Sequence, residues 1–189
     1  MSSGAPVGAV FIDRDGTVNR ELSSYVRSPA QLEIFPYSAD ALKPLAERDI
    51  PVIIVSNQAG VGKGLMTEED LLAIEARLRA ALGAAGVTIH AAYYCRHTDA
   101  MCCPCRKPKG GLLRLAAKEL HIDLANSYMI GDSWRDMAAG RDAGVTTVFV
   151  PTGINPEEQA RRAGNMADYR AASLADAVSW ICHKRDREE

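Results

Sequence analysis

With 189 residues, of which 47% are hydrophobic and 24% charged, the chain has the length and composition of one soluble globular domain, which we expect to span residues 1–189. Its formal net charge of −2 excludes the broad positive field with which proteins bind nucleic acid or anionic membranes, and no apolar run is long enough to cross a bilayer. The N-terminus lacks the basic leader of a signal peptide, so we expect a cytoplasmic protein, and we expect a monomer with neither nucleic acid nor membrane as a partner.

Short apolar segments alternate with longer amphipathic ones along the chain. In chain order, the predicted strands are residues 7–12, 52–55, 87–94, 127–130 and 146–150. The predicted helices are 38–48 with Ser38 as N-cap, 67–82 with a Thr67–Asp70 capping box, 111–120, 134–143 and 173–182. This alternation predicts a doubly wound α/β fold, in which a mostly parallel central sheet lies between two layers of helices. Polar residues that follow the strands then meet at the carboxyl edge of the sheet.

Two aspartates follow the first predicted strand directly, in the segment DRDGT. Positions two apart in an extended chain point the same way, so we expect Asp13 and Asp15 to share one site while Arg14 points elsewhere. Gly16 then lets the chain turn away from the sheet.

Further polar side chains follow the later predicted strands or the cysteine-rich loop: Ser56, Asn57, Gln58, Lys107, Asp132 and Asp136. Several carboxylates at one edge repel each other unless a hard cation lies among them, and Mg²⁺ is the natural candidate. The metal and a lysine would together neutralise a bound anion, and phosphate fits this description. Taken singly, each of these residues has a simpler interpretation as a solvated turn, a helix cap or a surface charge.

The segments DRDGT, VSNQ, RKP and GDSWRD, in this order and spacing, resemble the four signature motifs of the haloacid dehalogenase superfamily of phosphohydrolases. The resemblance implies that Asp13 is the nucleophile, forming an aspartyl phosphate, and that Asp15 is the general acid and base. It implies a Mg²⁺ site made by Asp13, the backbone carbonyl of Asp15 and Asp132, with Asp136 as a helix cap or in support of Asp132. It also implies that Ser56 and Lys107 bind the oxygens of the transferred phosphate.

Four cysteines and a histidine lie close together between residues 95 and 105. Cys95, His97, Cys103 and Cys105 are a ligand set suited to a tetrahedral structural Zn²⁺, with no position left open for water. Cys102 could replace Cys103, although the Cys-x-Cys spacing favours Cys103 and Cys105. We expect this zinc loop to fix the residues that follow it.

Arg106 and Lys107 come directly after the last proposed zinc ligand, and Pro108 follows them. A phosphate-binding lysine needs a fixed position, which a loop of this length lacks unless it is held. We therefore expect the zinc to direct Lys107 to the transferred phosphate and Arg106 to the substrate.

The zinc loop followed by CRKP resembles the D-glycero-D-manno-heptose 1,7-bisphosphate 7-phosphatases and the related histidinol-phosphate phosphatases, which are small enzymes without a large cap domain. The segment 56–72 is more similar to the heptose enzymes. The resemblance thus implies removal of the 7-phosphate from the heptose bisphosphate, in a pathway to nucleotide-activated heptose such as that of lipopolysaccharide, with histidinol phosphate as the alternative. The expected contacts to the sugar phosphate are Glu21, Tyr25, Asn57, Gln58 and Arg106.

One position departs from this pattern. Some heptose phosphatases carry a lysine directly after the aspartate of GD, whereas this chain has Ser133 there and Arg135 two residues further on. The sequence therefore leaves open which residue binds the second phosphate and which anomer is preferred.

Two interpretations from other classes are weaker. A zinc-organised binding module without catalysis would have no use for a complete set of Asp13, Asp15, Ser56, Lys107 and Asp132. A DNA-end phosphatase would be expected to carry a stripe of basic and aromatic residues, which this sequence lacks.

Overall fold

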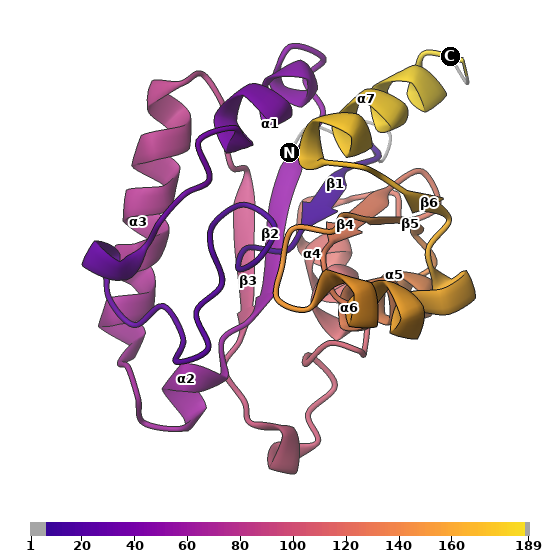
Figure 1. The fold of residues 1–189 in the computed structure, drawn as a ribbon. Coiled ribbons are helices and arrows are strands. Elements are labelled where there is room, and N and C mark those ends of the chain that lie inside the picture. The colour runs from indigo at the N-terminus through magenta and orange to yellow at the C-terminus, as the bar shows by residue number, and fades with distance from the viewer. Residues whose placement is uncertain (1–6, 188–189) are drawn as a thin grey trace.

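The structure is a computed structural model that describes residues 7–187. Six parallel strands form one sheet in the order β3-β2-β1-β4-β5-β6 (Figure 1). In chain order, the strands are β1 (Val10–Ile12), β2 (Val52–Asn57), β3 (Ala91–Cys95), β4 (Tyr128–Gly131), β5 (Thr146–Phe149) and β6 (Tyr169–Arg170). The helices are α1 (Ser38–Ala46), α2 (Ala59–Gly62), α3 (Glu68–Ala84), α4 (Gly111–Leu120), α5 (Trp134–Ala143), α6 (Pro156–Ala163) and α7 (Leu174–Arg185).

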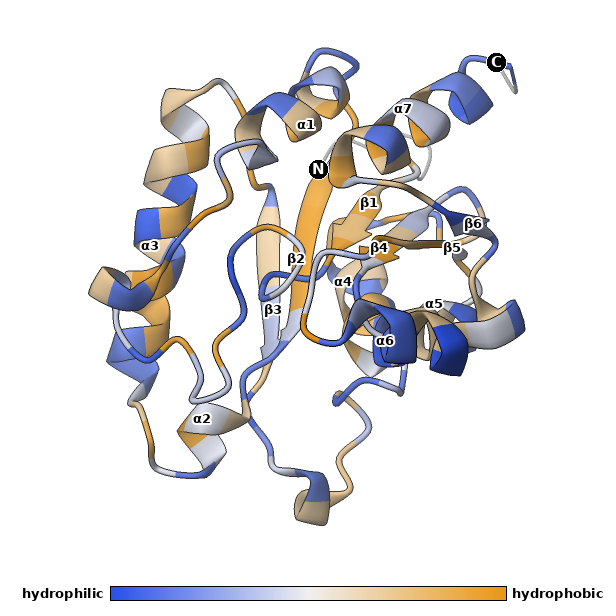
Figure 2. Cartoon of the chain, in the orientation of Figure 1, coloured by the Kyte–Doolittle hydropathy of each residue, from blue (hydrophilic) through white to orange (hydrophobic). Residues whose placement is uncertain are grey.

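The sheet is buried on both faces, which is why its strands are almost continuously apolar (Figure 2). Side chains alternate along each strand, so Val10 and Ile12 of β1 pack in one core with α1, α3 and α7. Phe11 points to the opposite face and packs with α4 and α5. The predicted doubly wound, three-layer α/β fold is confirmed, and no domain-sized insertion interrupts residues 7–187.

Local signals explain where the helices begin. At the start of α3, Thr67 and Asp70 form the predicted capping box, in which each side chain accepts a hydrogen bond from the other's backbone N–H. The prediction of Ser38 as an N-cap is wrong: Ser38 is the first residue of α1, and its hydroxyl instead donates to the carbonyl of Val18 at 2.7 Å. This bond fastens α1 to the segment that follows β1.

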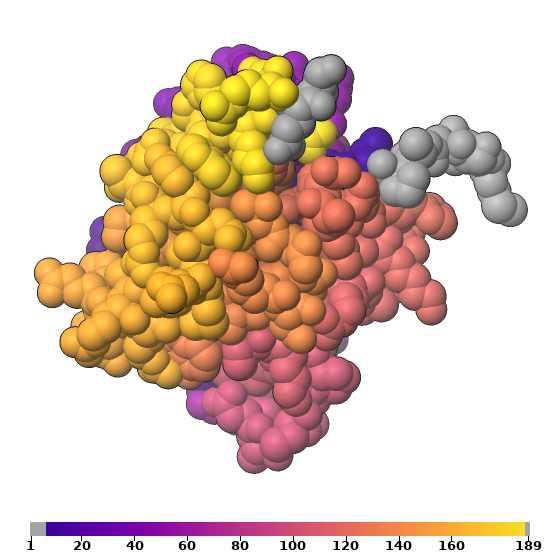
Figure 3. Space-filling model, turned by 90° about the vertical axis from the view of Figure 1, so that its right-hand side faces the viewer, coloured from indigo at the N-terminus to yellow at the C-terminus, as the bar shows by residue number. Residues whose placement is uncertain are grey.

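The order of the strands determines where a site can form. β1 lies inside the sheet, with β2 on one side and β4 on the other. The chain passes from β1 to β2 and β3 on one side and then crosses to β4, β5 and β6 on the other. A crevice therefore opens at the carboxyl ends of β1 and β4, where loops diverge to the two sides. The loop of residues 96–110 projects beyond the same edge, at the bottom of Figures 1 and 3. No helix in the described part of the chain is both long and apolar enough to span a membrane.

Candidate active site

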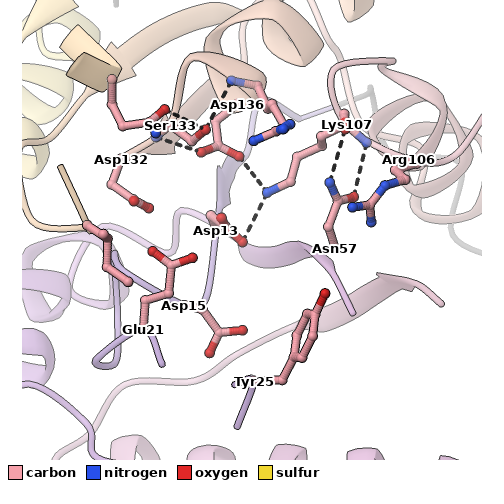
Figure 4. A pocket seen from close by; sticks show the side chains of 13 residues that line it. Asp13, Asp15, Glu21, Tyr25, Asn57, Arg106, Lys107, Asp132, Ser133 and Asp136 are labelled. Atoms are coloured by element: carbon pink, nitrogen blue, oxygen red, sulfur yellow. Dashed lines mark hydrogen bonds and ion pairs between the residues drawn. The ribbon is translucent and has the colours of Figure 1, made fainter. Parts of the chain in front are cut away.

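A cavity of about 270 Å³ lies at the carboxyl edge of the sheet and is lined mainly by polar side chains (Figure 4). Its lining residues come from the loops after β1, β3, β4 and β5, from the end of β2, and from the first turns of α5 and α6. They are Asp13, Asp15, Glu21, Tyr25, Asn57, Arg106, Lys107, Asp132, Ser133, Arg135, Asp136, Ile154 and Gln159. Five segments distant in sequence thus meet where the fold opens.

Lys107 lies between two carboxylates on the floor of this cavity. Its Nζ is 3.0 Å from Oδ1 of Asp13 and 2.5 Å from Oδ1 of Asp136, and it donates a third bond to the carbonyl of Val55 at 2.9 Å. Only 2% of the Lys107 side chain is exposed, and burial alone would favour the neutral amine. The two carboxylates outweigh this cost and raise the pKa of Lys107 above its ordinary value, so the side chain carries its charge at neutral pH.

The backbone of Lys107 is held as firmly as its side chain. The Asn57 amide at the end of β2 donates to the Lys107 carbonyl at 3.0 Å and accepts from the Lys107 N–H at 3.0 Å (Figure 4). This pair of bonds joins the loop of residues 96–110 to the central sheet. We therefore attribute to Asn57, which was predicted to bind substrate, a structural contact with the loop in addition to its place on the cavity wall.

Asp15 is oriented by three donors. Arg14 donates to both of its carboxylate oxygens, with Nη2–Oδ2 at 2.7 Å, while Asn19 donates at 2.9 Å and Gln58 at 2.7 Å. The expectation that Arg14 points elsewhere is wrong: its side chain is fully buried and lies against Asp15, because the regular strand ends at Ile12 and side-chain alternation ends with it.

Three carboxylates converge as a possible cation site. One oxygen from each of Asp13, Asp132 and Asp136 lies within 4.8 Å of the others. Burial, followed by the charges of Asp136 and Asp13, raises the pKa of Asp132 well above its ordinary value. Burial also raises the pKa of Asp136 to about 6, although Lys107 opposes the change. A hard divalent cation bound among these carboxylates would relieve their mutual repulsion.

The surroundings of Asp132 fit this interpretation. Its Oδ1 accepts a hydrogen bond from Thr17 at 2.8 Å, and two loops approach it so closely that only glycine fits. A Cβ on Gly153 would lie 1.7 Å from Asp132 Oδ2, and one on Gly16 would lie 2.6 Å away. The residues present therefore fit a Mg²⁺ ion held by Asp13 and Asp132. Asp136, expected in support, contributes an oxygen to the cluster and contacts Lys107, while the Asp15 side chain lies outside it.

The second metal-binding cluster lies in the loop after β3. Sulfur–sulfur distances among Cys95, Cys103 and Cys105 run from 3.2 to 3.6 Å, and His97 Nδ1 lies 3.2 Å from Cys105 Sγ and 3.8 Å from Cys95 Sγ. Zn–S bonds of about 2.3 Å in a tetrahedron place sulfurs about 3.8 Å apart, so this set fits Zn²⁺. Cys102 is exposed and lies outside the cluster, where its thiol contacts the Asp99 carbonyl.

The predicted substrate contacts separate into two groups. Glu21, Tyr25 and Arg106 line the cavity. Burial raises the pKa of Glu21, and Tyr25, held at a φ of 66°, accepts a hydrogen bond from Lys63 at 2.8 Å. Ser56 and Gln58 do not line it: both are buried beside Asp15, and the Gln58 amide reaches the Ser56 hydroxyl at 3.2 Å.

Comparison with known proteins places this geometry in a family. Residues 104–177 match the model of the HAD-hydrolase-like family. The D-glycero-β-D-manno-heptose-1,7-bisphosphate 7-phosphatases of Pasteurella multocida and Escherichia coli K12 are each 37% identical to the chain, over 92% and 93% of its length and 96% and 94% of theirs. The chain belongs to the heptose bisphosphate phosphatase family.

A solved structure extends the likeness to three dimensions. The D,D-heptose 1,7-bisphosphate phosphatase of B. bronchiseptica superposes with a TM-score of 0.88 at 30% identity, covering 94% of this chain and 99% of that one. That protein was crystallised with magnesium and phosphate. The haloacid dehalogenase resemblance drawn from four short motifs, and the narrower resemblance to the heptose bisphosphate phosphatase family drawn from the zinc loop, are both confirmed.

The sequence did not indicate every residue that shapes the site. Arg14 and Asn19 orient Asp15, Thr17 orients Asp132, and the segment before α6 brings Ile154 and Gln159 to the cavity wall. Thr17 follows the DRDG run directly and could have been found there, whereas no motif marks residues 154–159. Their position depends on packing of the segment after β5 beside the sheet edge.

Proposed function

We propose that this protein is a Mg²⁺-dependent phosphomonoester hydrolase that removes the 7-phosphate of D-glycero-D-manno-heptose 1,7-bisphosphate, the β-anomer by analogy with the names of its relatives, through an aspartyl-phosphate intermediate. The observation that carries the proposal is the contact of Lys107 with both Asp13 and Asp136 in a polar cavity at the sheet edge. The relatives' activity supports the choice of substrate. The product supplies a pathway of heptose activation.

Asp13 is the proposed nucleophile, and its two oxygens have different surroundings. Oδ1 accepts from the Arg14 N–H at 2.7 Å and contacts Lys107 at 3.0 Å. Oδ2 receives no hydrogen bond from residues 7–187. One oxygen is thus fixed while the other is free to attack phosphorus, and a carboxylate needs no base to activate it.

The transferred phosphate must be neutralised before an anionic carboxylate can approach it. When bound among Asp13, the Asp15 carbonyl and Asp132, Mg²⁺ would supply part of the required positive charge. Lys107 supplies the rest from a fixed position. Ser56 does not line the cavity as it stands, but it accepts from Gln58, so its own hydroxyl hydrogen is not used in that bond and would reach a phosphoryl oxygen only by turning toward the cavity.

Asp15 is the proposed proton carrier. In the first step it protonates the sugar oxygen as the P–O bond breaks and phosphorus becomes bonded to Asp13. In the second step it takes a proton from the water that attacks phosphorus, which releases phosphate and restores Asp13. Its three donors, Arg14, Asn19 and Gln58, hold the carboxyl at the cavity edge for both steps.

The zinc loop has a structural role in this proposal. With Zn²⁺ on Cys95, His97, Cys103 and Cys105, the chain is fixed immediately before Lys107. These ligands bind zinc as reduced thiolates, which accords with our expectation of a cytoplasmic protein.

A substrate panel tests the proposal. With Mg²⁺ present, we expect phosphate release from the heptose bisphosphate with a kcat/KM at least about tenfold above that for histidinol phosphate or 5′-phosphorylated DNA. Asp13→Asn is the matched control and should reduce turnover by about 10⁴-fold or more with an unchanged circular dichroism spectrum. Faster hydrolysis of histidinol phosphate would overturn the substrate assignment, and full activity of the variant would overturn the nucleophile.

A further inference from the structure

The proton carrier Asp15 rests on a buried cation, Arg14, and the question of what holds Arg14 in turn depends on the proposed function. Arg14 is fully buried and directs Nε and Nη2 at the Asp15 carboxylate, with Nη2–Oδ2 at 2.7 Å. Its third nitrogen, Nη1, has no hydrogen-bond partner among residues 7–187. Buried N–H groups of a charged guanidinium are destabilising unless some group accepts from them, so an acceptor is required behind Arg14.

Asn19 carries a second unused polar atom next to Arg14. Its Nδ2 donates to Asp15 Oδ1 at 2.9 Å, and Arg14 Nη2 contacts the same oxygen at 3.0 Å. Asn19 is fully buried, and its Oδ1 accepts no hydrogen bond within the described part of the chain. An unsatisfied donor and an unsatisfied acceptor therefore belong to two side chains that meet at one carboxylate oxygen.

Tyr94 supplies a third unused group. It lies on β3 and is 7% exposed, and the centre of its ring is 5.9 Å from the guanidinium carbon of Arg14. Its register partner on β2 is Ser56, which itself lies beside Asp15. The Tyr94 hydroxyl is buried, and nothing in residues 7–187 forms a hydrogen bond with it. Burial raises the pKa of Tyr94, so the phenol keeps its proton at neutral pH.

The helix that covers this face of the sheet leaves the Tyr94 hydroxyl unsatisfied. Tyr94 belongs to the same core as Leu71 and Ile74 of α3, which are apolar. Glu75 and Arg79 of α3 act on the phenol electrostatically, but they pair with each other at 2.6 Å. A partner for the hydroxyl therefore has to come from the side of Arg14 and Asn19.

We propose that one buried water molecule joins Arg14, Asn19 and Tyr94, and that Tyr94 is thereby a positioning residue for the proton carrier Asp15. No direct hydrogen bond joins Arg14 Nη1, Asn19 Oδ1 and Tyr94 Oη in the structure. A water can accept from the first, donate to the second and share a hydrogen bond with the third, and about three such bonds are typical of buried water. Arg14 is then held by Asp15 on one side and by the water and the Tyr94 ring on the other.

Tyr94→Phe tests the inference, because it keeps the ring and removes only the hydroxyl. Tyr93→Phe is the matched control: Tyr93 is the preceding residue of β3, packs with the core on the opposite face, and donates to Glu119 at 2.8 Å. We expect Tyr94→Phe to lower kcat for the heptose bisphosphate about tenfold with KM changed less than about twofold, since Tyr94 does not line the cavity. The control should match wild type. An unchanged kcat in Tyr94→Phe, or an equal loss in Tyr93→Phe, would overturn the inference.

Two further measurements distinguish positioning of Asp15 from general damage to the fold. Departure of p-nitrophenolate needs no proton, so the single-turnover rate constant for its release from p-nitrophenyl phosphate should stay at the wild-type level in Tyr94→Phe. In an Asp15→Asn background, Tyr94→Phe should lower the residual kcat no further, because it acts only through Asp15. A slower first turnover, or losses that multiply in the double variant, would contradict the proposed role.

The inference and the proposed function fail in different ways. If Asp15→Asn keeps full turnover, Asp15 is not the proton carrier and the inference fails with it. If Asp15→Asn loses turnover and Tyr94→Phe does not, the inference alone fails. A crystal structure of the wild-type protein should show one ordered water bonded to Arg14, Asn19 and Tyr94, and the lack of a water there would refute the proposed link.

Discussion

Asp15 illustrates how much of the chemistry depends on a single side chain and its donors. Three residues fix its carboxyl group, and one of them, the fully buried Arg14, is adjacent in sequence. An acid that must give a proton to one oxygen and then take one from another needs this fixed direction.

Asp15→Asn should therefore separate the two steps. A sugar leaves as an alkoxide that needs a proton, whereas p-nitrophenolate does not, so we expect turnover of the heptose bisphosphate to fall by about 10²–10⁴-fold. With p-nitrophenyl phosphate, the variant should release about one equivalent of p-nitrophenol rapidly and then stall, because water attack still needs the base. Stopped-flow absorbance measures this burst. Equal loss for both substrates with no burst would argue against Asp15 as the proton carrier.

The sequence predicted the reactive residues better than the residues that hold them in position. Asp13 and Asp132 could be found because they follow strands directly, where the fold places chemistry. Arg14 could not, because the alternation rule was applied to residues 13–15, which lie beyond the end of β1 at Ile12. The pair of bonds between Asn57 and Lys107 joins residues fifty positions apart and depends on tertiary packing alone.

At the scale of elements, the zinc loop links metal binding to catalysis. Its four ligands converge, and Lys107 follows two residues after the last of them. Loss of one ligand should release the loop while Asn57 still holds its far end. The loop is therefore where metal content and activity should change together.

Cys103→Ser should lower the zinc content from about one per chain to well below one and reduce kcat with it. Cys102→Ser is the matched control, since Cys102 is exposed and lies outside the cluster. Metal analysis by inductively coupled plasma mass spectrometry, with kcat on the same preparations, checks both. Full zinc in Cys103→Ser and loss in Cys102→Ser would mean that the neighbouring thiol is the ligand.

Elements with strong local signals matched their predictions, and short polar ones did not. The helices predicted at 111–120 and 134–143 coincide with α4 and α5. By contrast, α6 was missed because its sequence, PEEQARRA, is mostly polar and buries only Ala163, so it contains no apolar run to recognise. α2 and β6 are too short to give a pattern, and their form comes from the neighbours against which they pack.

At the scale of the whole molecule, the acidic cluster couples folding to pH and to metal. The folded protein holds the pKa values of Asp132 and Asp136 above their ordinary value of 3.8, that of Asp136 at about 6. The folded state therefore binds these protons more tightly than the unfolded chain does. The contribution of these groups to stability without metal is full below about pH 4 and falls as pH rises through 6.

Mg²⁺ should reverse this loss, because it competes with protons for the same oxygens. At about 100 times its Kd, we expect Mg²⁺ to raise the melting temperature by about 5–10 °C at pH 7.5 and by clearly less at pH 5. Asp132→Asn should lose most of the effect. Differential scanning calorimetry on the zinc-loaded protein measures it, and an equal rise at both pH values would contradict the proposed cation site.

The order of the strands could not be predicted from the sequence, although the fold class could. Alternating strands and helices predicted a parallel sheet covered on both sides. Nothing local specifies that β4 pairs with β1, because that neighbour is chosen by packing across the whole sheet.

The cavity is built from two kinds of support. Asp13 and Asp132 directly follow strands of the sheet, and Arg106 shares the zinc loop with Lys107, whereas Glu21 and Tyr25 lie on the loop after β1. Glu21 and Tyr25 can therefore change without moving Lys107, so directed evolution could vary that one loop while the reaction itself stays intact. New sugar phosphates could be reached from this scaffold without rebuilding its catalytic floor.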